Sequence, residues 1–213
     1  MKKVTALLLL LAILVSCVPA MAVEQKYTSP VLGTSFVLPD YLDVLVELPD
    51  KDGNGTVIYF TMLDDETQII STMKYVPEFL GLQTRDVPKE EIEGWKEFFT
   101  DKYPKHSKSM LIKPKYNSSQ RIYRFYGMNE EGKWMLNYTG VKDGLYVSVC
   151  CEAGRFGYKS AIMRAIFEVF NGSFQMFAAS RGIDFVRFDP DDYEVEIFDL
   201  LYDDSPSSIF RKY

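Results

Sequence analysis

Residues 120–152 read QRIYRFYGMNEEGKWMLNYTGVKDGLYVSVCCE, and this stretch decides the fold class. It contains three runs rich in aromatic and β-branched residues, a composition typical of β-strands. Asn129-Glu130-Glu131-Gly132 and Lys142-Asp143-Gly144 separate the runs, and both are suited to hairpin turns. We therefore predict an antiparallel three-strand meander, with strands at 120–128, 133–141 and 145–152.

The segments around the meander predict two helices and further strands. From Lys89 to Tyr103 apolar residues recur at helical spacing behind Pro88, which suits a first helical turn. A second helix is expected from Tyr158 to Phe170, ended by Asn171-Gly172. Upstream strands are expected at 35–38, 44–48, 56–63 and 68–76. This order predicts an α+β fold in which an antiparallel β-sheet is flanked by two main helices as a sandwich.

The first 22 residues have the pattern of an export signal. Two lysines precede an uncharged apolar run from Val4 to Val15, and Ala20-Met21-Ala22 offers a peptidase site. The apolar run is shorter than the about 20 residues that a membrane-spanning helix needs. A second interpretation is that Leu14-Val15-Ser16-Cys17 is a lipobox, in which Cys17 is lipidated and holds the protein at a membrane. Both interpretations predict a bacterial protein that works outside the cytoplasm.

The expected organisation is a signal peptide at 1–22, one α+β domain at 23–176 and an acidic C-terminal extension at 177–213. The formal net charge is −6 and becomes −8 without the two leader lysines. From Gly182 to Tyr213 the chain holds nine acidic and three basic residues, with a strand-like stretch at Tyr193 to Phe198. A nearly neutral body with an acidic tail is a poor electrostatic partner for nucleic acid.

The stretch DKDGNG, which begins at Asp50, resembles the start of an EF-hand loop. Asp50, Asp52 and Asn54 stand at positions one, three and five, where oxygen ligands bind calcium. The twelfth position is Thr61 rather than the required glutamate, and both flanks have the composition of strands. We interpret the stretch chiefly as a hairpin turn. The alternative is a weak calcium site at Asp50, Asp52 and Asn54, with Kd ~10⁻⁴–10⁻³ M. No other cofactor is expected.

The meander also carries a group of aromatic residues: Tyr123, Trp134, Tyr138 and Tyr146. On an open sheet face they would form a binding surface for a glycan or an envelope protein. The interpretation that we favour is that they pack beneath the helices. The competing functional class is a hydrolase that uses two carboxylates converging in one pocket. The single histidine, His106, gives no pattern typical of nucleophilic catalysis or of a zinc site.

Two short motifs and the order of elements resemble the PsbP-like family, which includes the extrinsic protein of photosystem II and bacterial envelope lipoproteins. Gly33, Phe36 and Pro39 match its entry, and Ser173-Phe174 matches its close, over roughly residues 27–176. The resemblance implies a sheet between helices and a non-catalytic, extracytoplasmic accessory or binding role. No segment matches the metal or docking residues of the photosynthetic members, and the acidic extension departs from the family pattern.

Overall fold

The computed structural model describes residues 25–62, 67–112, 121–153 and 160–188. Seven strands form one antiparallel sheet in the order β3-β4-β5-β9-β8-β7-β6, and β1 and β2 form a separate hairpin. The expected α+β class and the meander are confirmed. The strands are β1 (Gln25–Thr28), β2 (Ser35–Leu38), β3 (Leu42–Pro49), β4 (Gly55–Met62), β5 (Gln68–Tyr75), β6 (Lys105–Ile112), β7 (Ile122–Met128), β8 (Trp134–Lys142) and β9 (Leu145–Ala153).

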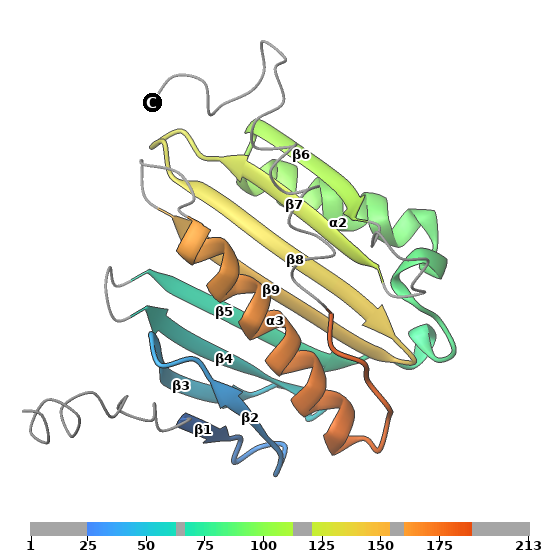
Figure 1. The fold of residues 1–213 in the computed structure, drawn as a ribbon. Helices are drawn as coiled ribbons and strands as arrows, with labels where there is room; N and C mark the ends of the chain where they lie inside the picture. The colour runs from blue at the N-terminus through green and yellow to red at the C-terminus, as the bar shows by residue number, and fades with distance from the viewer. Residues whose placement is uncertain (1–24, 63–66, 113–120, 154–159, 189–213) are drawn as a thin grey trace, which may run out of the picture.

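Two helices lie on opposite faces of the sheet, so the sandwich is also confirmed. Helix α3 (Ser160–Ser180) crosses the front face in Figure 1 and packs on β9, β5 and β8 of the sheet and on β2 of the hairpin. Helix α2 (Lys89–Lys102) lies behind β6 and β7. Two short 3₁₀ turns, η1 (Pro77–Phe79) and η2 (Thr84–Asp86), lead from β5 to α2. The rear of the sheet is therefore covered mainly at the β6 side.

The main core lies between α3 and the sheet. In β9 the alternation of side chains places four buried residues on the α3 face, as the sequence predicts: Leu145, Val147, Val149 and Cys151. One hydrogen bond also crosses this core: the hydroxyl of Ser71 in β5 donates to the hydroxyl of Ser173 in α3 at 2.6 Å. The helix is thus fixed to the sheet by apolar packing and by one buried hydroxyl pair.

The expected end of the second helix at Asn171-Gly172 is wrong, because α3 continues to Ser180. Asn171 is used instead to hold the backbone of Phe188. Gly172 makes room for the ring of Phe36, which would lie 2.3 Å from a Cβ at that position. The helix ends at Ser180 and is followed by Gly182, whose φ of +66° suits a left-handed cap, and the amide of Ile183 donates to the carbonyl of Ala178.

The sequence did not predict β6, the strand that contains His106. This strand pairs with β7 and forms one edge of the sheet. Its sequence, KHSKSMLI, is rich in lysine and serine. Lysines are typical of edge strands, where they discourage pairing with other chains. The polar composition therefore hid the strand from a prediction based on apolar and β-branched residues.

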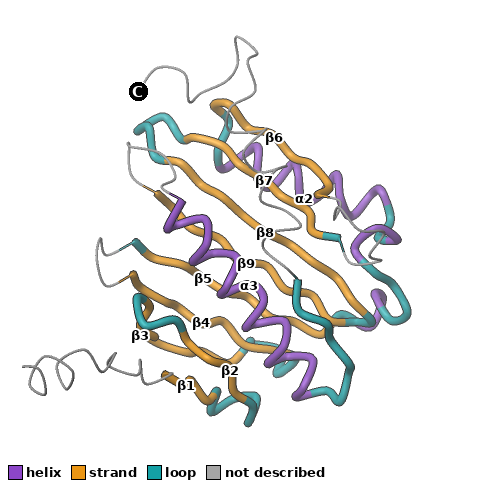
Figure 2. The backbone as a smooth tube through the Cα atoms, in the orientation of Figure 1, coloured by secondary structure: helices purple, strands orange, loops and turns teal. Residues whose placement is uncertain are grey.

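The chain returns toward the sheet after α3, as the loop colour of Figure 2 shows up to residue 188. Phe185 stacks on Phe174 with ring centroids 4.7 Å apart, and Phe188 is buried. The domain therefore packs at least as far as Phe188, and the boundary expected at 176/177 falls inside α3. The segment 1–22 that we expect to be a signal peptide, Cys17 within it and the stretch 193–198 that we expect to be strand-like all lie outside the described residues.

Candidate functional site

The stretch DKDGNG forms the turn between β3 and β4. Pro49 pairs with Thr56, and the amide of Asp50 donates 2.9 Å to the carbonyl of Gly55. Gly53 has a φ of +71°, which glycine adopts without strain. The hairpin interpretation of this stretch is confirmed.

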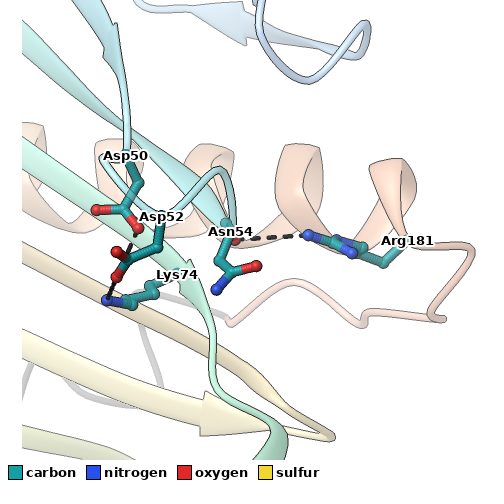
Figure 3. A network of polar contacts seen from close by, with 5 residues as sticks. All are labelled: Asp50, Asp52, Asn54, Lys74 and Arg181. Carbon is teal, nitrogen blue, oxygen red and sulfur yellow. Dashed lines mark hydrogen bonds and ion pairs between the residues drawn. The ribbon is translucent and has the colours of Figure 1, made fainter.

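Lys74, from the neighbouring strand β5, places its ammonium group within ion-pair distance of both turn carboxylates (Figure 3). Its Nζ lies 3.0 Å from Oδ2 of Asp52 and 3.7 Å from Oδ2 of Asp50. The hydrogen bond to Asp52 and the charge of Asp50 raise the pKa of Lys74 above its ordinary value. Asn54 lies apart from the two carboxylates, and its backbone carbonyl accepts a 3.5 Å hydrogen bond from Arg181. A lysine ammonium therefore already pairs with both aspartates of the alternative calcium site.

The hydrolase hypothesis requires two acidic side chains in one sheltered site. Asp50 and Asp52 share one cation, but they lie in a turn and the Asp52 side chain is 64% exposed. A catalytic acid in glycoside hydrolysis usually needs burial to hold its proton. Within the described ranges, no group of three or more His, Cys, Asp and Glu side chains is arranged to hold a metal ion.

The meander aromatics do not form one open patch, because alternation divides them between the two faces of the sheet. Tyr138 faces α3 and is fully buried against Phe167 and Phe170. Trp134, on the same side of β8, is also buried. The prediction of one exposed binding surface is therefore wrong for these four residues: Tyr123, Trp134, Tyr138 and Tyr146.

The other two meander aromatics lie on the rear face beside α2. Trp95 of α2 packs against Tyr123 and Tyr146, with ring centroids 6.4 and 5.6 Å apart. Phe99 and Tyr103 continue this packing over Phe125 of β7. The packed interpretation of the meander aromatics is the one that the ring contacts support.

A different surface is exposed on the rear of the sheet, beyond the reach of α2. We call it the open face and define it by five residues of three adjacent strands: Val46 and Leu48 of β3, Val57 and Tyr59 of β4, and Ile70 of β5. The strand register places Val46 beside Tyr59 and Tyr59 beside Ile70, with Leu48 beside Val57. Val46 is 42% exposed and Leu48 48%, and the other three are half-buried.

The open face lies next to a sheet edge that no other described strand pairs with. Among the described residues, β3 pairs only with β4, and its ladder is interrupted by a bulge between Val44 and Val46. The bulge leaves Leu45 53% exposed at the same edge. The sequence reasoning missed this surface because it followed aromatic residues only. The signal was present in VLVELP and TVIYFTM, where apolar residues occupy both faces of strands β3 and β4.

The acidic residue of β3 that faces the α3 side has a structural role. The carboxylate of Glu47 accepts hydrogen bonds from the hydroxyls of Tyr27, Ser29 and Thr56. Burial and this contact raise the pKa of Tyr27 above its ordinary value, so that its hydroxyl keeps its proton. The cluster ties the β1–β2 hairpin to the main sheet. Three neutral donors stabilise the carboxylate, an arrangement that needs no substrate to be complete.

Arg124 of β7 is buried on the α3 side of the sheet with only 1% of its surface exposed. Its register partners are Met110 of β6 and Tyr138 of β8. Nη2 donates to the sulfur of Met110 at 3.5 Å, and the guanidinium lies 5.3 Å from the ring centroid of Tyr126. Burial raises the pKa of the Tyr138 hydroxyl, and the charge of Arg124 opposes that rise.

Within the described part of the chain, no helix has the length and hydropathy of a membrane span. The fold is similar to the solution structure of cyanobacterial PsbP (CyanoP) from Synechocystis sp. PCC 6803. The two share 14% identity with a TM-score of 0.43, and the match covers 74% of this chain and 95% of that one. PsbP is the name of the family that the sequence resembles. No protein-family model matches the chain, and no curated protein matches its sequence.

Proposed function

We propose that this chain is an exported, non-catalytic accessory protein that binds a partner protein through the open face. The observation that carries the proposal is the row of exposed aliphatic side chains on β3, next to an unpaired strand edge. Contiguous exposed apolar surface on a folded domain is typical of an interaction site. An unpaired edge adds backbone groups that a partner strand can bind.

The composition of the open face favours a protein over a glycan. Sugar rings bind chiefly on exposed aromatic faces, and Tyr59 is the one aromatic among the five residues that define the surface. Val46, Leu48, Val57 and Ile70 supply a flat aliphatic surface, which suits the apolar centre of a protein interface. The rim is charged, because Asp52 and Lys74 lie at the end of the same strands.

Export is supported by the leader pattern of the first 22 residues, with cleavage after Ala22 and lipidation of Cys17 as the two routes. A lipidated chain would be held at a membrane, and a cleaved chain would be free in the envelope or outside the cell. Both routes deliver the protein to partners outside the cytoplasm.

The test is site-specific photo-crosslinking in cells of the native host, with benzoyl-phenylalanine in place of Leu48. We expect a discrete crosslinked protein, and we expect Val46→Asp in the same chain to remove it. Benzoyl-phenylalanine in place of Leu80 is the matched control, because Leu80 is also exposed but lies outside the open face. Equal crosslinking at Leu48 and Leu80, or a crosslink that survives Val46→Asp, would overturn the proposal.

A further inference from the structure

Helix α2 covers one side of the rear of the sheet and leaves the other side bare. It packs on β6 and β7, and no described helix covers the rear of β3, β4 and β5, where the open face lies (Figure 1). A helix is about 10 Å across, and two packed sheets lie about 10 Å apart. A second sheet that packs on the open face therefore fills the same layer as α2 and ends beside it. The rear surface has the shape of a step, and a second copy of the same step completes it.

The side of α2 that borders the bare strands carries an exposed ring and a lysine. Phe98 is 71% exposed, and the exposed Lys102 follows one helical turn later, so both lie on one side of the helix. This side is directed toward β9, where Cys150 is the register partner of Ile70 in the open face. Burial raises the pKa of the Cys150 thiol, and the nearby charge of Lys102 opposes that rise. We call Phe98 and Lys102 the inner flank of α2.

The exposed edge of β3 carries a matching pair of residues. Leu45 is 53% exposed at the bulge, and the exposed Asp43 stands two residues before it. Neither Asp43 nor Lys102 forms an ion pair within the described part of the chain. In an extended strand Leu45 and Asp43 are about 7 Å apart. In a helix Phe98 and Lys102 are about 6 Å apart. Each pair therefore combines one apolar and one charged residue at nearly the same spacing, and the two charges are opposite.

The strand register shows that the two pairs also point the same way. At the end of α2, Tyr103 donates a 3.1 Å hydrogen bond to Glu152, near the end of β9. This end of β9 pairs with the start of β5, which pairs with the end of β4 and so lies level with Asp43 at the start of β3. Earlier in α2, Trp95 packs on Tyr146 near the start of β9, which lies level with the β3–β4 turn. The helix therefore runs along the sheet in the direction opposite to β3.

We propose that the partner at the open face is a second copy of this chain, packed rear to rear about a two-fold axis that runs parallel to the strands between β4 and β5. This rotation keeps every residue at its level along the strands and exchanges the two sides of the sheet. The inner flank of α2 in each copy then meets the β3 edge of the other. Phe98 packs on the partner's Leu45, and Lys102 pairs with the partner's Asp43. A two-fold axis across the strands is excluded, because it places the two α2 helices against each other and holds the open faces apart.

This inference rests on the proposed function, because it names the partner of the same surface. Its test is the dissociation constant of the dimer, measured by sedimentation equilibrium on residues 23–213. We expect Val46→Asp to abolish the dimer, because it buries an unpaired charge in the interface. We expect Phe98→Ser, Asp43→Lys and Lys102→Asp each to raise the dissociation constant at least ~10-fold. Asp43→Lys and Lys102→Asp in one chain exchange the two charges, and we expect this double variant to return to within ~3-fold of the wild type.

The matched control is Lys96→Asp, because Lys96 lies about 200° round the helix from Phe98 and pairs there with Glu93. We expect this change to leave the dimer intact. The changed side chains are exposed, so the variants are expected to fold, which circular dichroism checks. A chain that is monomeric at millimolar concentration would overturn the proposal. A dimer that the single charge reversals leave intact, or that the double exchange does not restore, would also overturn it.

The crosslink at Leu48 separates this inference from the proposed function. A crosslinked product with the mass of two copies supports both. A product with a different protein, obtained while the purified chain is monomeric, supports the proposed function and overturns the second copy as the partner. Crosslinking at Leu48 that is no stronger than at Leu80 overturns both.

Discussion

Asn171 holds the backbone of Phe188 in both directions. Its Nδ2 donates 3.0 Å to the Phe188 carbonyl, and its Oδ1 accepts from the Phe188 amide at 2.8 Å. Both residues are buried, so neither backbone group has water as an alternative partner. A side chain in the middle of α3 thereby determines where the chain runs after the helix.

Asn171→Ala is expected to destabilise the protein by about 2–4 kcal/mol, because it leaves a buried N–H and a buried C=O unsatisfied. Chemical denaturation measures the free energy of unfolding. Asn54→Ala is the matched control in an exposed turn, where a change within about 0.5 kcal/mol is expected. A loss at Asn171 no larger than that of the control would contradict this role.

Two glycines in helices are expected to respond in opposite directions to alanine. Gly172→Ala places a Cβ 2.3 Å from the Phe36 ring, and overpacking of this kind costs about 1–3 kcal/mol. Gly94→Ala in α2 meets nothing within 4 Å and is expected to stabilise by about 0.5–1 kcal/mol. Thermal melts of the two variants beside the wild type check both signs. Stabilisation by Gly172→Ala would mean that the ring of Phe36 moves aside at no cost.

Calcium is expected to stabilise the wild-type turn little, because the ion would have to displace the Lys74 ammonium. The measurement is a thermal scan with excess chelator and then with millimolar calcium. Lys74→Gln is expected to give the larger rise in Tm, since it removes the competing cation and leaves Asp50 and Asp52 in place. A clear rise in the wild type that vanishes in Asp52→Ala would instead make Asp50, Asp52 and Asn54 a calcium loop.

Alkaline pH is expected to destabilise the fold partly through Tyr138. Burial raises its pKa in the folded protein above the ordinary 10.0, so the unfolded chain releases this proton first. The resulting stability is present below about pH 10 and is lost as the pH rises through the folded-state pKa. Denaturation midpoints at pH 8 and pH 10.5 measure the loss, which Tyr138→Phe should reduce. An unchanged pH dependence in Tyr138→Phe would contradict the assignment.

The parts of the fold that follow from local pattern could be predicted from the sequence. The meander turn at Asp143-Gly144 is an example, because both residues have positive φ as a two-residue hairpin requires. Helix α2 also begins at Lys89 as expected. Both features depend on interactions within a few residues, which sequence patterns record.

The features that depend on distant contacts could not be predicted. Asn171-Gly172 has the composition of a helix end. In the structure Gly172 instead makes room for the ring of Phe36, and Asn171 binds the backbone of Phe188. Neither contact can be read from the residues next to this pair. The open face likewise depends on how far α2 extends across the sheet, which no local pattern specifies. Tyr138 and Tyr146 look alike in sequence, and only the packing of two helices on two faces distinguishes them.

The pairing of β5 with β9 has a consequence for how the chain becomes stable. It joins two half-sheets, and its paired residues are 70 positions apart at Tyr75 and Leu145 and 82 apart at Ile69 and Cys151; α3 then packs on both halves. Contacts of such long sequence separation form late and make folding slow. A chain threaded N-terminus first through a membrane pore would therefore emerge with β3, β4 and β5 lacking their apolar cover. These strands would stay without that cover until α3 had also crossed.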